Sequence, residues 1–184
     1  MNHKQPWNCE GSPWKTESAF WVWVRGVLRK GWSKHPIKLE YIQRNRKRVP
    51  NPVEKNRKRF PEVWGMECEI CHKDCLQKDI EIDHIGDNCS FTGIHDVEKY
   101  VAHLYLIDYS SIRACCKNCH SIVSHSQNEG ISFEEAKVAK EIIRLMKKEN
   151  KQEMLEILSQ NGYTNCTNDT KRKAALKEIF SKEN

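Results

Sequence analysis

The chain has 184 residues, of which 38% are hydrophobic and 30% are charged, and its formal net charge is +6. This length and composition are typical of one compact folded domain with helical extensions, which excludes a fibrous or wholly disordered chain. The longest apolar run, Ala19 to Val24, is far shorter than the roughly 20 residues that cross a bilayer, so the sequence predicts a cytoplasmic protein with no membrane partner.

The positive charge is concentrated in the first third of the chain. Residues 1–60 contain 15 Lys and Arg against 4 acidic residues, whereas residues 61–184 contain 16 basic and 21 acidic ones. A Lys or Arg placed against a phosphate releases condensed counterions, so a basic segment binds polyanions in a salt-dependent way. DNA is therefore the predicted partner, and residues 1–60 are predicted to contact it.

The first predicted helix covers about residues 16–30 and follows an irregular, Pro-containing start. Apolar residues recur at helical spacing from Phe20 to Leu28, although Gly26 weakens the pattern. Five of the six Trp residues lie at or before Trp32. We expect most of them to pack this segment against the rest of the protein, and the alternative is stacking on nucleic-acid bases.

Two dense basic clusters follow, separated by Pro50 and Pro52. Arg forks and Lys amines at this density are suited to phosphate contacts, and the alternative is a solvated surface or a flexible linker. The predicted DNA-binding residues are Arg44, Arg46, Lys47, Arg48, Lys55, Arg57, Lys58 and Arg59.

Two CxxC pairs frame the middle of the chain, and nine cysteines in a reducing compartment indicate metal ligands before disulfides. The CxxC spacing lets one tight turn direct both sulfurs at one ion, and two such turns complete a tetrahedral structural zinc site. The predicted ligands are Cys68, Cys71, Cys116 and Cys119. Cys75 and Cys115 are close enough in sequence to replace one of them, and this alternative stays open.

Between the two CxxC pairs, residues 79–85 alternate between apolar and polar side chains, which predicts a short strand. Asp83 and His84 then point to different sides of that strand, which suits one metal ligand and one proton acceptor. A helix is predicted over residues 95–107, and another is predicted to start near Cys116.

The order of CxxC, Asp-His-Ile at 83–85 and CxxC followed by His120 resembles the HNH endonucleases over residues 61–125. The resemblance implies a small α+β fold with a ββα-metal core and a four-cysteine zinc. It also implies that His84 is the general base and that Asp83 and His120 hold one catalytic Mg²⁺ or Mn²⁺ at the scissile phosphate. Small basic HNH proteins are similar to phage or mobile-element nucleases, which implies the cytoplasm of a bacterial host.

One position departs from the family pattern. HNH enzymes usually carry an Asn shortly before the second CxxC, and Ser111 stands there in this chain. Ser has a shorter reach, so the orientation of His84 is expected to be looser, or to be assisted by Asp108 or Asn118. The segment 86–108 is also longer than in compact members of the family.

The last third of the chain is predicted to be helical. Ser132 and Glu135 form a capping-box pattern, and further helices are predicted over residues 152–160 and 170–181. These helices either brace the nuclease module or form a unit that docks a protein partner or provides auxiliary DNA binding.

The sequence thus predicts a basic, Trp-rich, DNA-contacting region (1–60), an HNH nuclease module (61–130) and a helical region (131–184). The predicted function is a metal-dependent DNA endonuclease or nickase. The alternative is a non-catalytic zinc protein that binds nucleic acid, in which Asp83, His84 and His120 have no necessary role. A RING-type finger is disfavoured because it needs two complete ligand sets.

Overall fold

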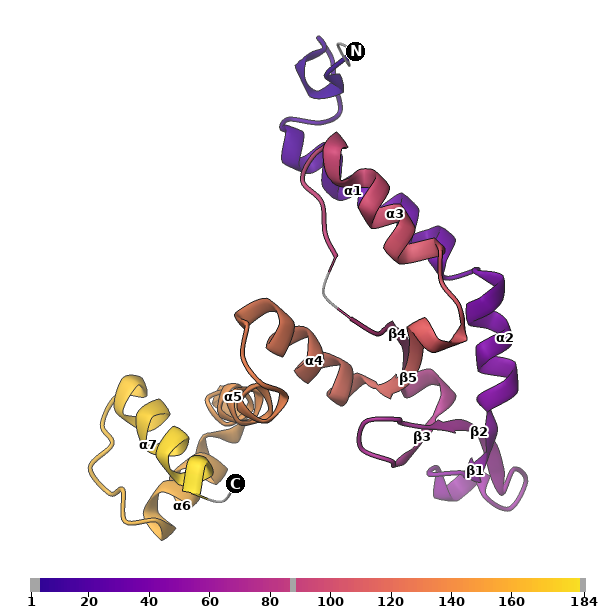
Figure 1. The fold of residues 1–184 in the computed structure, drawn as a ribbon. Coiled ribbons are helices and arrows are strands. Elements are labelled where there is room, and N and C mark those ends of the chain that lie inside the picture. The colour runs from indigo at the N-terminus through magenta and orange to yellow at the C-terminus, as the bar shows by residue number, and fades with distance from the viewer. Residues whose placement is uncertain (1–3, 87–88, 183–184) are drawn as a thin grey trace. The chain divides into compact units, whose positions relative to one another are not determined.

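The computed structural model describes residues 4–86 and 89–182, and its contacts divide the chain into two units, residues 1–117 and 118–184 (Figure 1). The described residues form seven α-helices and two small antiparallel sheets, which confirms the predicted small α+β class. Among these residues, none of the helices combines the length and hydropathy that spanning a bilayer requires.

The first unit begins with two helices, α1 (Glu17–Trp32) and α2 (Pro36–Asn45). The Thr16 side chain accepts a hydrogen bond from the Ala19 amide and so starts α1 close to its predicted position. Pro36 occupies the first turn of α2, where its missing amide hydrogen costs nothing. The sequence analysis did not predict α2 as a helix.

Helix α3 (Val97–Tyr105) runs beside α1, and this agrees with the predicted helix over residues 95–107 (Figure 1). Arg29 Nε donates to the Tyr100 hydroxyl at 3.3 Å, and the Tyr105 hydroxyl donates to the carbonyl of Leu28. A Cβ at Gly31 would collide with the Tyr105 hydroxyl, so glycine permits this close approach.

The core of the first unit is largely aromatic. Trp21 and Trp32 are buried in it, as the packing prediction for the Trp residues requires, whereas Trp23 remains 53% exposed. The other buried members of this cluster are Tyr41, Met66, Ile82, Phe91, Tyr100, Leu104, Ile112 and Ala114.

Three strands form one antiparallel sheet in the order β1 (Lys47–Pro50), β2 (Glu62–Glu67) and β3 (Asp74–Leu76). The β1–β2 hairpin therefore carries most of the predicted DNA-binding residues. In its register Arg48 lies opposite Trp64.

The second sheet pairs β4 (Ile80–His84) with β5 (Ile112–Cys116), and α4 (Lys117–Glu129) follows β5 directly. Strand β4 confirms the strand predicted at 79–85, and α4 confirms the helix predicted near the second CxxC. The antiparallel register sets His84 opposite Ile112 and Ile80 opposite Cys116. The predicted ββα-metal identity of this segment stays a prediction.

The second unit also contains α5 (Phe133–Leu145), α6 (Lys151–Gln160) and α7 (Asp169–Lys182), in agreement with the predicted helices. The capping box of Ser132 and Glu135 is present, and Asn168 Oδ1 accepts a hydrogen bond from the Lys171 amide at the start of α7. The core of this unit is aliphatic, and its buried members are Ile142, Leu145, Met154, Leu158, Ala175, Leu176 and Ile179.

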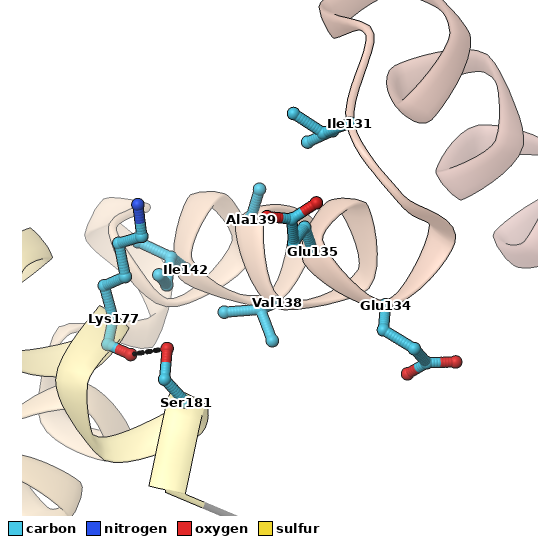
Figure 2. Close-up of a pocket in the computed structure, with 8 residues that line it drawn as sticks. All are labelled: Ile131, Glu134, Glu135, Val138, Ala139, Ile142, Lys177 and Ser181. Carbon is cyan, nitrogen blue, oxygen red and sulfur yellow. Dashed lines mark hydrogen bonds between the residues drawn. The ribbon is translucent and has the colours of Figure 1, made fainter. Parts of the chain in front are cut away.

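A groove of about 400 Å³ lies along α5 and α7 (Figure 2). Val138, Ala139 and Ile142 give it an aliphatic lining. Its polar groups serve their own helices: the Ser181 hydroxyl donates to the Lys177 carbonyl at 2.7 Å, and Glu135 belongs to the capping box. The groove thus has the character of a packing defect between two helices.

Candidate metal centre

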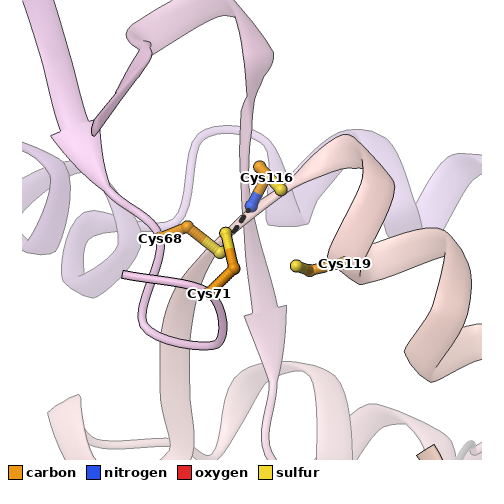
Figure 3. A group of neighbouring side chains, drawn as sticks. All are labelled: Cys68, Cys71, Cys116 and Cys119. Atoms are coloured by element: carbon orange, nitrogen blue, oxygen red, sulfur yellow. Dashed lines mark hydrogen bonds between the residues drawn. The ribbon is translucent and has the colours of Figure 1, made fainter. Parts of the chain in front are cut away.

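The two CxxC pairs meet in the folded chain. The sulfur atoms of Cys68, Cys71, Cys116 and Cys119 all lie within 4.8 Å of one another (Figure 3). Four thiolates at about 2.3 Å from one zinc ion stand about 3.8 Å apart in a regular tetrahedron, so the group fits such an ion. The four cysteines can therefore hold a metal ion such as zinc, as the sequence predicted.

The two competing cysteines are directed elsewhere. The Cys75 thiol donates to the Lys73 carbonyl and the Cys115 thiol donates to the Glu81 carbonyl, each at 3.6 Å. Burial raises the pKa of Cys115 to about 12 and is also the main cause that raises the pKa of Cys75 to about 11. The mutually close cysteine group among the described residues is Cys68, Cys71, Cys116 and Cys119, without Cys75 or Cys115.

The pKa of Cys68 is shifted in the opposite direction. Burial alone would raise its pKa, but backbone N–H groups of Cys116, Cys71 and Ile70 point at its sulfur and lower the pKa to about 6. The Cys116 amide donates at 3.3 Å. Thiolate is the ligand form of cysteine, so these amides prepare the first CxxC for a metal ion.

The turn that presents this CxxC depends on His72. Its φ of 55° is left-handed, a conformation in which His is enriched among non-glycine residues. The chain thereby closes on itself, and the His72 amide donates to the Cys68 carbonyl at 2.8 Å while the Cys68 amide donates to the Lys73 carbonyl at 3.0 Å.

Glu69, inside the first CxxC, ties this turn to β5. Its amide donates to the Ala114 carbonyl at 2.9 Å, and its carboxylate accepts from the Ala114 amide at 2.8 Å. The carboxylate also accepts a hydrogen bond from the hydroxyl of Tyr41 on α2, whose pKa is raised by burial and by Glu69. Helix α2 and strand β5 thus hold the first CxxC beside Cys116. The sequence analysis missed this network, because nothing local couples Tyr41 to Glu69.

Asp83 and His84 end strand β4. Asp83 lies opposite Arg113 in the strand register, and its Oδ2 accepts from the Arg113 guanidinium at 3.1 Å. The Asp83 side chain is only 16% exposed. Carboxylate oxygens are ligands that hard divalent cations prefer, so the end of β4 carries a side chain of the right chemistry for such an ion.

The His84 ring packs against Trp32, with a ring-centroid distance of 4.3 Å. Its Nε2 lies 3.3 Å from the carbonyl oxygen of Leu104 on α3. A carbonyl only accepts hydrogen bonds, so this contact requires the proton on Nε2 and leaves the lone pair on Nδ1. The ring is thereby oriented for proton acceptance through Nδ1.

The charge state of His84 favours the same role. Burial is the main cause that lowers its pKa below the usual value, and His103 and Lys38 lower it further against the opposing effects of the Leu104 carbonyl and Asp83. The ring is therefore neutral at neutral pH, and a neutral imidazole can take a proton.

Lys38 is a second cation of this region that the sequence analysis did not single out. Its ammonium lies 4.8 Å from the ring centroid of Trp32, the same Trp that contacts His84. Burial lowers its pKa, and Glu81 opposes that effect. A half-buried cation near a general base can stabilise an anionic substrate group.

Ser111 acts through its backbone as well as its side chain. Its amide donates to Asp108 Oδ1 at 3.0 Å and its hydroxyl accepts from the Asp108 amide at 3.3 Å, which together make a capping box. Its carbonyl accepts from the Ile85 amide at 2.8 Å and so closes the β4–β5 ladder. His84 itself contacts the Leu104 carbonyl, a partner that lies in the long insertion 86–108.

His120 is the second residue of the predicted cation pair. It lies in the first turn of α4, half-buried and directly after Cys119. Its role as a ligand stays a prediction.

Of the eight predicted DNA-binding residues, three form the ion pairs or hydrogen bonds described next. Lys47 bridges Glu67 and Asp74 at 3.3 and 2.6 Å. Arg44 pairs with Glu40, and Arg57 Nε donates to the Asn51 carbonyl at 2.7 Å. The other five, Arg46, Arg48, Lys55, Lys58 and Arg59, are exposed.

Comparison with models of known protein families, with curated proteins and with solved structures gave no match to this chain.

Proposed function

We propose that this protein is a divalent-metal-dependent DNA endonuclease or nickase of the HNH type. One observation carries the proposal. Strand β4 pairs with β5 and α4 follows β5 directly, while α3 is inserted between the two strands; the cysteine group lies at the β5–α4 junction and Asp83-His84 at the far end of β4.

In this proposal the four cysteines have a structural role. Four thiolates fill a tetrahedral zinc shell and leave no position for water or substrate, so the zinc ion would fix the β5–α4 junction without taking part in hydrolysis. The reacting groups are then Asp83, His84 and His120.

His84 would remove the proton from the attacking water through Nδ1, since Nε2 contacts the Leu104 carbonyl. Asp83 and His120 would bind a Mg²⁺ or Mn²⁺ ion, and Arg113 would hold the Asp83 carboxylate in position. When bound, such an ion supplies positive charge to the phosphate and to the departing oxygen. Lys38 would add charge stabilisation on the α2 side.

A supercoiled-plasmid assay with Mg²⁺ or Mn²⁺ tests the proposal. The wild type should convert the plasmid to nicked or linear DNA, and His84→Ala should lose about a hundredfold or more of that rate, the usual contribution of a general base. His95→Ala is the matched control, because His95 is exposed and lies outside the site. Equal rates for wild type and His84→Ala would refute the assignment of His84.

The alternative is a non-catalytic zinc protein that binds nucleic acid. The ion pair of Asp83 with Arg113 favours it, because a carboxylate already neutralised by a guanidinium has less need of a metal ion. An absence of conversion by the wild type with either ion, on supercoiled and single-stranded substrates alike, would decide for this alternative.

A further inference from the structure

The β1–β2 hairpin carries a surface that the proposed cleavage chemistry does not use. We define this hairpin surface as Arg46, Arg48, Arg59, Phe60 and Trp64. All five are exposed, and Phe60 and Trp64 are exposed to 53% and 42%. Large aromatic rings at this exposure, grouped with arginines, indicate a binding surface more than a core.

The aromatic and cationic groups of this surface are stacked on one another. The guanidinium carbons of Arg46 and Arg48 lie 4.3 and 4.4 Å from the ring centroid of Trp64. Arg48 and Trp64 are cross-strand partners, and Arg46 is two residues before Arg48, so the strand geometry keeps all three together. Near the loop, the Arg59 guanidinium lies 5.2 Å from the Phe60 ring.

The loop between the two strands is internally fixed. Asn51, 5% exposed, is the buried polar residue at its base. Its side-chain amide donates to the Phe60 carbonyl at 2.9 Å, its side-chain oxygen accepts from the Val53 amide at 3.0 Å, and its carbonyl accepts from Arg57. Such a loop presents its basic residues without the full ordering cost that a flexible linker would incur on binding.

The charge of the hairpin is strongly one-sided. Residues 46–64 contain seven Lys and Arg against two Glu. Of the seven, Lys47 is neutralised by Glu67 and Asp74, and this leaves the excess mainly on the Trp64 face and the loop. The partner that complements this charge is a polyanion.

We propose that the hairpin surface binds single-stranded DNA, with bases stacking on Phe60 and on the stack that Trp64 forms with Arg46 and Arg48, and with phosphates contacting the arginines. Paired duplex bases hide their flat faces from a protein, whereas unpaired bases offer them to exposed aromatic rings. The interleaving of arginine with two such rings therefore fits unpaired bases better than a groove. The inference goes beyond the proposed cleavage, since a hairpin can bind DNA whether or not the site near His84 cuts it.

Fluorescence anisotropy with a labelled oligothymidylate tests this, with the full chain in buffer without added divalent metal. Trp64→Ala should weaken binding about tenfold, the scale of one lost base stack, and Trp64→Phe should restore most of it. Trp23→Ala is the matched control, because Trp23 is a comparably exposed Trp on α1. A thermal melt of each variant confirms that it is folded.

The arginines have a matched control as well. Arg46→Gln and Arg48→Gln should each reduce the slope of log affinity against log salt by about one, whereas Lys47→Gln should leave it nearly unchanged. Equal weakening by Trp64→Ala and Trp23→Ala, or tighter binding of a duplex of the same length that depends on Trp64, would overturn the proposal. So would a preference for oligouridylate over oligothymidylate. The anisotropy assay measures binding without cleavage. A failure of this binding proposal can therefore be distinguished from a failure of the proposed nuclease function.

Discussion

The two units of the protein hold their ionisable groups in different ways. In the first unit, burial is the main influence on the pKa values of Lys38, Tyr41, His84 and Cys115, although exposed groups such as Glu40 and Glu67 are shifted by hydrogen-bonded neighbours there too. In the second unit, the shifted pKa values belong to exposed groups whose main influence is a hydrogen-bonded neighbour, as for Arg144 between Glu141 and Glu153.

This difference separates groups that are candidates for a reactive role from groups that only stabilise the fold. An exposed ion pair changes little when water screens it, whereas a buried titratable group has a cost that the fold must offset. Groups perturbed by burial gather at functional sites more often than exposed ones do. Functional groups are therefore expected among the burial-shifted residues of the first unit and at Cys119 and His120 at the start of α4, rather than on the aliphatic helices α5 to α7.

Removal of the metal should have the largest effect on folding, and it should affect the two units differently. A chelator or Cys68→Ser should unfold much of the first unit, because the binding energy of a structural zinc ion is folding energy. The second unit, with its own core, should retain its helices. Hydrogen exchange read by mass spectrometry would locate the loss.

Cys166→Ser is the control for that experiment, since Cys166 lies outside the cysteine group and donates to the Lys171 carbonyl. Metal analysis should find about one zinc per chain in the wild type and in this control. A folded wild type that contains no metal would contradict the structural zinc.

A cavity created by mutation in the core of the second unit should have the next largest effect on stability. Leu176 is fully buried in the aliphatic core, so Leu176→Ala should lower the free energy of unfolding of this unit by about 2–5 kcal/mol. Urea unfolding would measure the free energy of unfolding, and hydrogen exchange would show which residues are affected. If the exchange rates of residues 1–117 rise equally, the two units are not independent in stability.

Loss of the Tyr41 hydroxyl should have a smaller effect. Tyr41→Phe removes the hydroxyl of a buried Tyr from an exposed carboxylate that water can partly resolvate, and it should cost about 0.5–1.5 kcal/mol. Zinc release to a chelator should also become faster, because the network holds the first CxxC. Tyr109→Phe is the control, since its hydroxyl bonds Glu40 at the surface and its loss should change stability less.

The raised pKa of Tyr41 also predicts how the stability of the protein depends on pH. The folded protein raises the pKa of Tyr41, so the neutral form contributes stability that is complete below the usual tyrosine pKa of about 10 and is lost as pH rises above it. Chemical unfolding at pH values on either side of 10 should show this loss in the wild type and less of it in Tyr41→Phe. An identical pH profile for both would contradict the assignment.

Much of the secondary structure could be predicted from short-range patterns. The alternation at 79–85, the capping box of Ser132 and the helical spacing in α1 each depend on residues within a few positions. The hairpin was not predicted, because β1 is four residues long, contains Arg and Pro, and becomes a strand only through its pairing with β2.

The sequence by itself determined the four cysteines, since the CxxC spacing already fixes which sulfurs one turn can direct at one ion. Only the tertiary structure decided the surroundings of the other groups. The contact of His84 with Trp32 and Leu104, the bond from Tyr41 to Glu69 and the stack on Trp64 each join residues distant in the chain. Burial and pKa depend on such contacts, and no local pattern encodes them.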